Sequence, residues 1–246
     1  MSQMRLDKLL THLHCGSRKE VGALIRAGRI AADGLLVRDP AYKIDPETVS
    51  VSMDGVPQRY QAQRYFMLNK PAGVITASRD ERHDTVLELF PEAARRGLFA
   101  VGRLDKDTEG LLLLTDDGAF SHALMSPGRH VSKVYEATVE GELPSDAAAR
   151  FQQGLTLKDG TVCLPAAFEL LEQTPEQRVR VTLCEGKYHQ VKRMIAALGG
   201  VVVYLRRVQI GGLLLDEGLA PGAFRALTET EIALLGQRET GGLLKK

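Results

Sequence analysis

Residues 102–118 read GRLDKDTEGLLLLTDDG, a polar loop rich in carboxylates that runs directly into four leucines. The leucines form an apolar run of strand length, and the sequence Asp116-Asp117-Gly118 marks a turn after it. A carboxylate at the lip of a buried strand is held in place and shielded from free solvent, as a catalytic acid, base or nucleophile requires. The ordinary alternative is that these acids are simply solvated.

The alternating acids of this loop also approach the spacing of a calcium-binding EF-hand. However, the final ligand would be Asp116 where that motif needs glutamate, and Arg103 and Lys106 place positive charge where the cation would sit. The leucines indicate a strand, whereas an EF-hand loop leads into a helix. The sequence also has no CxxC, Cys/His cluster or HExxH pattern. We therefore expect no metal site.

The composition is that of an ordinary globular protein, with 44% hydrophobic and 26% charged residues in a chain of 246. No run of 18 apolar residues is present, and the N-terminus lacks the apolar segment of a signal peptide. The three cysteines are widely spaced and odd in number, which suits a reducing compartment. We expect a cytoplasmic protein that has no membrane partner.

The first 58 residues have the pattern of a small helical and β module. Four leucines at positions 6, 9, 10 and 13 have the spacing of an amphipathic helix. Ser17-Arg18-Lys19-Glu20 is a capping box that predicts the start of a second helix. Asp33-Gly34 predicts a two-residue hairpin, and Asp54-Gly55 predicts a further pair of strands. We expect a domain over residues 1–58.

This module is locally basic although the whole chain carries a net charge of only +1. Between positions 5 and 38, seven basic residues face three acidic ones. Such a patch is an expected footprint of phosphate binding, although charge runs are also common on solvated faces. The candidate RNA-binding residues here are Arg5, Lys8, Arg18, Lys19, Arg26 and Arg29.

A polar segment, 59–64, reads as a linker, and a larger domain is expected over 65–235. Its strand-like runs do not alternate strictly with helical ones, which favours an α+β fold on a mainly antiparallel or mixed sheet with flanking helices. The polar tail 236–246 is expected to be disordered. Strands are predicted at 65–68, 73–76, 111–115, 133–139, 179–183 and 201–205, and helices at 145–153 and 190–198.

A second cationic segment, EGKYHQVKRM, spans residues 185–194. Val191 and Met194 belong to a buried helix stripe, so Lys192 and Arg193 point sideways or outward. Positive charge near a helix start is not favoured by the macrodipole. The pair therefore suggests a partner outside the helix, either an RNA phosphate or an active-site carboxylate. A solvated pair is the alternative reading.

The sequence resembles the family of ribosomal RNA pseudouridine synthases that carry an N-terminal S4 RNA-binding domain. The resemblance rests on LNKPAG (68–73), the loop after Gly102, KVY (133–135) and EGKYHQVKRM, and it extends over nearly the whole chain. It implies the pseudouridine synthase fold for the larger domain and an S4 fold for the smaller one. We expect LNKPAG to lead from a strand into a rigid turn, made by Lys-Pro and the following Gly, and to have an architectural role.

The resemblance also implies roles for single residues. Asp105 matches the catalytic aspartate, and Lys192 matches the basic residue that pairs with it and keeps it ionised. Tyr135 would lie against the uracil, although a packed sheet aromatic is the usual fate of a strand tyrosine. Arg103 would occupy the space left by the flipped nucleotide, or contact a phosphate, and Arg193 is a further RNA-binding candidate.

The implied reaction is isomerisation of uridine to pseudouridine, which needs no redox change, energy input or metal, so no cofactor is expected. The motif YHQVKR is more similar to small-subunit members of the family. The expected partner is ribosomal RNA, within a partly assembled small subunit, and the protein is expected to be a monomer. Two alternatives stay open: a large-subunit RNA target, and a non-catalytic S4-type assembly factor for which Asp105 would be dispensable.

Overall fold

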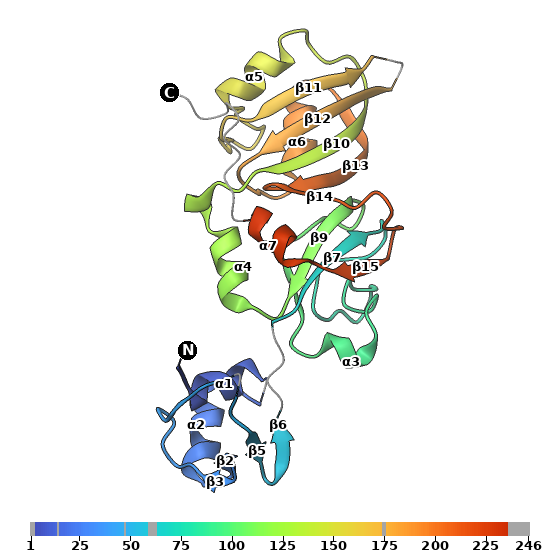
Figure 1. Cartoon of the computed structure of the whole chain (residues 1–246). Helices are drawn as coiled ribbons and strands as arrows, with labels where there is room; N and C mark the ends of the chain where they lie inside the picture. Colours follow the sequence, from blue (N-terminus) through green and yellow to red (C-terminus); the bar gives the residue numbers. More distant parts are fainter. Residues whose placement is uncertain (1–2, 14, 47, 59–62, 174–175, 236–246) are drawn as a thin grey trace. The chain divides into compact units, whose positions relative to one another are not determined.

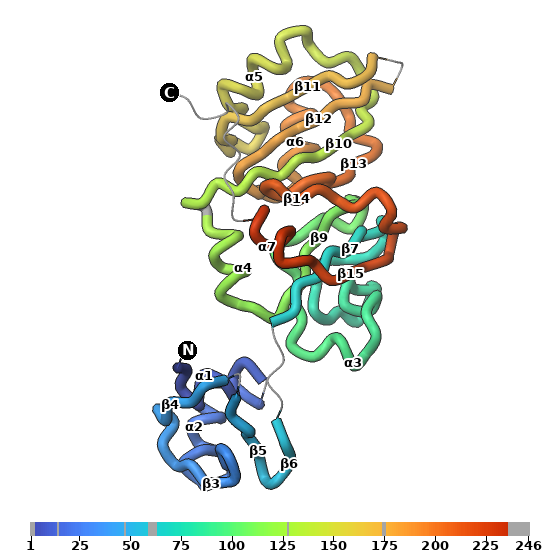
Figure 2. Tube along the Cα trace, in the orientation of Figure 1, coloured from blue at the N-terminus to red at the C-terminus, as the bar shows by residue number. Residues whose placement is uncertain are grey.

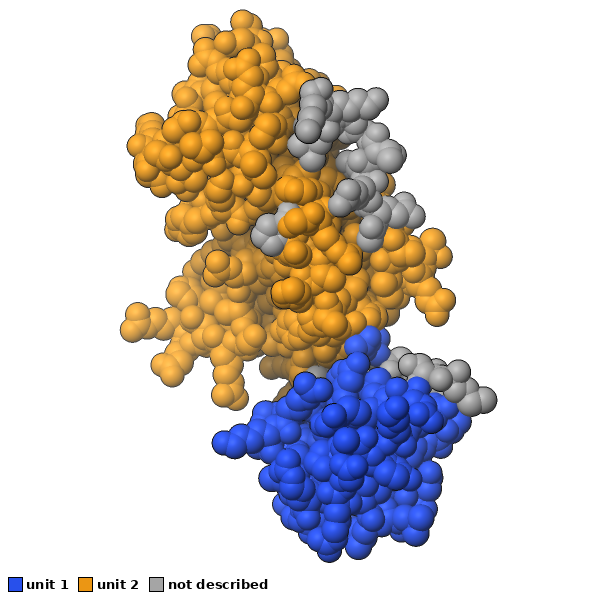
Figure 3. All heavy atoms as spheres, turned by 90° about the vertical axis from the view of Figure 1, so that its left-hand side faces the viewer, with its two compact units in different colours: residues 1–63 blue, residues 64–246 orange. Residues whose placement is uncertain are grey.

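The computed structural model describes residues 3–13, 15–46, 48–58, 63–173 and 176–235. The chain divides into two units, Met1–Gln63 and Arg64–Lys246, which are coloured separately in Figure 3. The predicted domains 1–58 and 65–235 fall within these units. The predicted tail 236–246 and most of the predicted linker 59–64 lie outside the described residues.

Unit 1 has two helices, α1 (Leu6–His12) and α2 (Arg18–Arg26), and a small antiparallel sheet in the order β3-β2-β5-β6. The predicted capping box is present: the Ser17 hydroxyl accepts from the Glu20 amide, and the Glu20 carboxylate accepts from the Ser17 amide. The leucine stripe of α1 packs against Val21 and Ile25 of α2. The strands are β1 (Met4–Arg5), β2 (Ile30–Ala32), β3 (Leu35–Leu36), β4 (Lys43–Ile44), β5 (Val51–Met53) and β6 (Val56–Gln58).

Unit 2 is built on one mixed sheet in the order β11-β12-β10-β13-β9-β7-β15 (Figure 1). Figure 2 shows that the chain leaves the β7–β9 half after α4, forms β10 to β12, and returns along β13. The strands on this path are β7 (Tyr65–Lys70), β9 (Glu109–Thr115), β10 (Lys133–Glu140), β11 (Ala167–Glu172), β12 (Gln177–Leu183), β13 (Val201–Ile210) and β15 (Phe224–Ala226).

Shorter elements complete unit 2. Two strands join the edges of neighbouring strands, β8 (Phe99–Val101) on β9 and β14 (Leu213–Leu214) on β13. The helices are α3 (Glu92–Arg95), α4 (Gly118–Met125), η1 (Pro127–Arg129), α5 (Ala147–Gln153), α6 (Gln190–Ala197) and α7 (Glu229–Leu235). In the part of the chain that the structure describes, no helix is both long and apolar enough to cross a membrane.

The leucine run of β9 joins two cores. Leu111 and Leu113 belong to a cluster with residues of α4 and α7, whereas Leu112 and Leu114 belong to a cluster with Phe90 and Leu98. Successive side chains of a strand point to opposite faces of its sheet. The continuous apolar run therefore reflects a strand that is buried on both faces, which fixes the end of the strand, and the loop before it, against the rest of unit 2.

Two sequence predictions for unit 2 were wrong. Residues 73–76 form no strand, only a single bridge between Ile75 and Thr85, because the rigid turn after Lys70 leads the chain away from the sheet. The turn signal at 116–118 is instead the start of α4, where the Asp117 carboxylate accepts from the Phe120 amide. An aspartate serves equally well in a turn and at a helix N-cap, so local sequence does not separate the two.

Candidate active site

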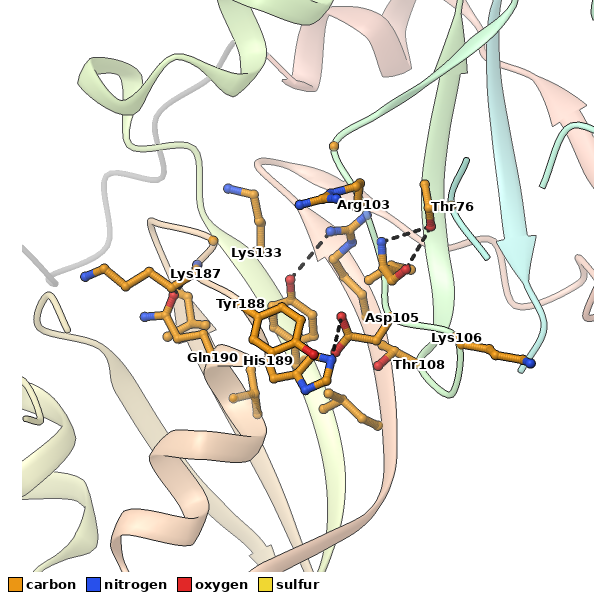
Figure 4. Close-up of a pocket in the computed structure, with 18 of the residues that line it drawn as sticks. Thr76, Arg103, Asp105, Lys106, Thr108, Lys133, Lys187, Tyr188, His189 and Gln190 are labelled. Carbon is orange, nitrogen blue, oxygen red and sulfur yellow. Dashed lines mark hydrogen bonds and ion pairs between the residues drawn. The ribbon is translucent and has the colours of Figure 1, made fainter. Parts of the chain in front are cut away.

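A pocket of about 490 Å³ lies in unit 2, where the loop before β9 faces β10, β13 and the start of α6 (Figure 4). Its lining includes the loop residues Arg103, Asp105 and Lys106, together with Tyr135 and His189. The volume is in the range of pockets that hold small ligands. Segments that are far apart in the sequence therefore converge on one cavity.

Lys70 fixes the backbone of the loop that carries Asp105. Its side chain is fully buried, and its Nζ donates hydrogen bonds to the carbonyl oxygens of Thr108 (2.9 Å), Pro71 (3.0 Å) and Lys106 (3.4 Å). Burial lowers the pKa of Lys70 to about 8, although Asp107 and Asp105 act in the opposite direction. Residues 68–73 thus contain the end of β7 and the turn after it. The buried ammonium group of Lys70, at the end of β7, holds three carbonyl oxygens in place.

Thr76 and Gly110 hold the same loop at two further points. The Thr76 hydroxyl donates to the Leu104 carbonyl at 2.8 Å and accepts from the Leu104 amide at 3.1 Å. Gly110 has a φ of +98°, and a Cβ atom there would overlap the Arg207 carbonyl oxygen of β13. Only glycine allows this close approach of β9 to β13, the pair of strands that runs parallel. The position of Asp105 is therefore fixed by backbone contacts on both sides.

The Asp105 carboxylate is 30% exposed and has two basic neighbours. Its Oδ2 lies 3.7 Å from Lys192 Nζ, and its Oδ1 lies 3.6 Å from His189 Nε2. Lys192 is closer to Asp107, at 2.5 Å, and this hydrogen bond lowers the pKa of the Asp107 carboxyl. Lys192 thus stands between two carboxylates, and Asp107, at 73% exposed, is the more accessible of the two.

The turn before α6 positions these basic groups. The Gln190 side chain is buried; it accepts from the Lys187 amide at 2.8 Å and donates to Glu185 at 2.5 Å. His189 has a φ of +48°, a conformation that is uncommon for residues other than glycine. Its ring stacks on that of Tyr188, with centroids 3.8 Å apart, and Figure 4 shows the two rings beside Asp105.

Tyr135 on β10 lines the pocket and contacts a buried arginine on the adjacent strand. Arg207 Nη1 lies 3.5 Å from the Tyr135 hydroxyl, and Arg207 Nε donates to the Leu111 carbonyl at 2.8 Å. Lys133, two residues before Tyr135, is also buried in the lining, and burial lowers its pKa. This wall of the pocket therefore contains two buried cations.

Three of the residues predicted to bind RNA form ion pairs with carboxylates of the protein in the structure. Arg5 is paired with Asp7 in unit 1, and Arg193 with Asp159 in unit 2. Arg29 in unit 1 binds Asp54 through two nitrogens. Lys8, Arg18, Lys19 and Arg26 are exposed on the two helices of unit 1, and Arg103 is exposed at the pocket.

Sequence reasoning missed Arg207 and Lys133, and gave Lys70 only the role of a turn residue. A signal for Arg207 existed, because it sits at a buried position of β13 between Leu205 and Ile210, both of which are buried. A charged residue on the buried face of a strand is rare unless it has a partner or a function. For metals, the described residues contain no group of three or more histidines, cysteines or acids that could hold an ion.

A mixed-sheet domain with a carboxylate in a pocket, in a chain that also carries a basic module, fits a class of enzymes that modify RNA. The chain belongs to the RNA pseudouridylate synthase family: the profile of that family matches residues 64–197, and the S4 domain profile matches residues 4–50.

Several named proteins are similar over almost the full length. The Escherichia coli K12 protein named ribosomal small subunit pseudouridine synthase A is 47% identical over 94% of this chain and 99% of its own length. The Salmonella typhimurium protein of the same name is 46% identical over 95% and 100%. The Bacillus subtilis protein named uncharacterized RNA pseudouridine synthase YtzG is 44% identical over 95% and 99%.

A solved structure agrees with these sequence relatives. The crystal structure titled pseudouridylate synthase superposes with a TM-score of 0.67 at 35% identity, covering 94% of this chain and 99% of that one. The expected pseudouridine synthase fold is thereby confirmed, together with the expected S4 domain.

Proposed function

We propose that this protein isomerises uridine to pseudouridine in the RNA of the small ribosomal subunit, with Asp105 as the catalytic residue. The observation that carries the proposal is the placement of Asp105: a carboxylate on a rigid loop, at a pocket, 3.7 Å from Lys192. The choice of the small subunit is supported by the names of the Escherichia coli and Salmonella typhimurium relatives.

In this reaction the C1′–N1 bond of uridine breaks, the uracil turns, and C5 bonds to C1′. Lys192 places positive charge beside Asp105, with its Nζ 3.7 Å from Asp105 Oδ2, and His189 Nε2 lies 3.6 Å from Asp105 Oδ1. Ionised Asp105 then attacks the ribose at C1′ or removes a proton from the sugar, and Tyr135 lies against the base. Because the loop is held by Lys70 and Thr76, the carboxylate needs little reorganisation to react.

The target base must leave its stack to enter the pocket, which costs a few kcal/mol. Arg103 is exposed at the pocket and is placed to take the position of the displaced base or to bind a phosphate. The exposed cations of α2 would add phosphate contacts that orient the enzyme without reading sequence. Binding energy from both units therefore offsets the cost of extruding the uridine.

We further propose that the substrate is a partly assembled small subunit, and that the protein acts as a monomer in the cytoplasm. The S4 domain supports a structured ribosomal target.

The test is tritium release from ribosomal RNA labelled with 5-³H-uridine, because C5 loses its hydrogen when it bonds to C1′. Small-subunit and large-subunit RNA would each be presented naked and as ribonucleoprotein, with the unmodified protein and Asp105→Asn. We expect release only by the unmodified protein and only from small-subunit substrates, while Asp105→Asn still binds RNA. Release by Asp105→Asn would overturn the assignment of Asp105, and release only from large-subunit RNA would change the target.

A further inference from the structure

The wall of the pocket formed by β10 and β13 contains two basic side chains, Arg207 and Lys133, that form no ion pair with any carboxylate of the described residues. Arg207 is 3% exposed and Lys133 is 9% exposed. The hydrogen bonds of Arg207 go to the Leu111 carbonyl and the Tyr135 hydroxyl, and that of Lys133 goes to the Val131 carbonyl. Among the described residues, neither cation forms an ion pair.

One nitrogen of Arg207 lacks a partner altogether. Its Nη2 is buried and makes no hydrogen bond, although the side chain lines the pocket. Leaving a buried donor unpaired costs roughly 1–3 kcal/mol, and more when the group is charged. Lys133 is a second buried basic group in the same wall; burial and then the charge of Arg207 lower its pKa, so a nearby negative charge would stabilise its protonated form. The wall is therefore poised to receive negative charge from a ligand.

The proposed reaction creates such a charge inside the pocket. When the C1′–N1 bond breaks, its electron pair leaves with N1 and spreads over N1, O2 and O4 of the uracil. When C5 bonds to C1′, the bond between Asp105 and C1′ breaks or, if Asp105 had removed a sugar proton, that proton returns to the sugar. The C5 proton then passes to solvent and N1 takes up a proton, so that atoms and charge balance. A uracil anion forms whether Asp105 attacks the sugar or removes a proton from it.

We propose that the buried guanidinium of Arg207 stabilises the detached uracil anion, and that Lys133 strengthens the same positive wall. This inference rests on the proposed function and adds a residue to it. Buried donors aimed at charge that develops during a reaction are worth far more than donors in water. The phosphates of the substrate are a poorer match, because they carry their charge before the reaction and are bound by exposed cations such as Arg103.

The experiment compares Arg207→Gln on two RNA substrates, one with uridine and one with 5-fluorouridine at the target position. Fluorine withdraws electrons and stabilises the pyrimidine anion, so the second substrate needs less help from the protein. Consumption of the target nucleoside would be followed under single-turnover conditions at saturating enzyme. We expect Arg207→Gln to slow the uridine substrate by about 10²-fold, the scale of one lost oxyanion donor, and the fluorinated substrate by clearly less. The rate of Arg207→Lys on the uridine substrate should lie between the rates of the unmodified protein and of Arg207→Gln.

The matched control is Arg150→Gln, because Arg150 is exposed on α5 and paired with Asp146, and it should leave both rates unchanged. An equal loss on both substrates, or weaker RNA binding with an unchanged saturated rate, would overturn the role of Arg207. Should Arg207→Gln not fold, the same pair of rates is measured for Arg207→Lys and Lys133→Met. A protein that consumes neither substrate would instead contradict the proposed function itself.

Discussion

The two sides of the pocket differ in both burial and charge. On one side Asp105 is partly exposed, has two basic neighbours within 4 Å, and shares Lys192 with Asp107. On the other side Arg207 and Lys133 are buried. The side chains of Lys192 and His189 contact Asp105 through side-chain atoms alone and can rearrange when RNA binds, whereas the loop that carries Asp105 is held through its backbone. The buried side is fixed by strands, and its charges act in a medium where electrostatic interactions are stronger.

On the proposed mechanism, one side of the pocket acts on the ribose and the other side acts on the base. The carboxylate side offers negative charge to a sugar centre that becomes electron-poor as its bond to N1 breaks. The cationic side offers positive charge to a base that becomes electron-rich in the same step. A pocket that separates charge in this way favours the transition state over the neutral substrate. Substitutions on the two sides, and in the elements that support them, should therefore have effects of different size.

The largest effect is expected at Lys192. Lys192→Met removes the ammonium beside Asp105, and we expect the single-turnover rate to fall by about 10²-fold, the usual size for loss of one charged partner at a reacting group. Asp107→Asn should leave the rate nearly unchanged, because Lys192 would then pair with Asp105 alone. Tritium release measures both variants. Equal losses in the two would mean that Asp107, and not Asp105, is the functional partner of Lys192.

An intermediate effect is expected at Lys70, which supports the Asp105 loop. Lys70→Met leaves the carbonyls of Thr108 and Pro71 without their donor, and we expect the rate to fall roughly tenfold, which corresponds to about 1.4 kcal/mol of barrier. RNA affinity should be nearly unchanged. A variant with full activity would show that the loop holds its position without this ammonium group.

The lowered pKa of Lys70 predicts that the stability of the protein depends on pH. Its pKa is about 8 in the folded protein and 10.5 when unperturbed. Between these values the unfolded chain binds more protons, so the free energy of unfolding rises with pH. Denaturant unfolding gives the free energy of unfolding of the unmodified protein and of Lys70→Met. The first value minus the second should therefore increase from pH 8 to 10.5. The total change should not exceed roughly 3.4 kcal/mol, because the two pKa values differ by about 2.5 and a pKa difference of one corresponds to about 1.36 kcal/mol.

The smallest effect concerns the basic face of unit 1. Arg18 and Lys19 are exposed at the start of α2, whereas Arg29 is bound to Asp54. Replacing Arg18 and Lys19 by alanine should weaken RNA binding a few-fold and reduce the slope of log affinity against log salt by about 1 for each phosphate that is no longer neutralised. Arg29→Ala should change the slope less. If all three substitutions change it equally, the Arg29–Asp54 pair opens on RNA binding.

Local patterns predicted those parts of the fold that local physics controls. The capping box before α2, the hairpin at Asp33-Gly34 and the leucine run of β9 are all present, because each depends on neighbouring residues alone. The same reasoning failed at residues 73–76, where apolar residues follow a rigid turn and lie outside the sheet. It also missed α4, because its N-cap aspartate looked like part of a turn.

The residues of the candidate site also divide into those that motifs reveal and those whose partners only the fold reveals. Asp105, Tyr135 and Lys192 could be named because motifs carry them, and the structure brings Lys192 to 3.7 Å from Asp105. The apolar pattern of β13 marks Arg207 as a charge at a buried position, but its partners could not be named, because they come from β9 and β10, which lie far from it in the sequence. Nor could the sequence show that Lys192 would be shared with Asp107, since that depends on how the loop meets the start of α6.

The sequence by itself determined several helices and hairpins, the family and the candidate catalytic carboxylate, because these follow from propensity, periodicity and motif. Only the tertiary structure decided which charges are exposed and which are buried. That distinction depends on packing between strands that are distant in the chain, and it sets the local dielectric, the available partners and therefore the strength of each charge. Arg207 and Arg103 are both arginines in the sequence, yet one is buried in the pocket wall and the other is exposed at the pocket.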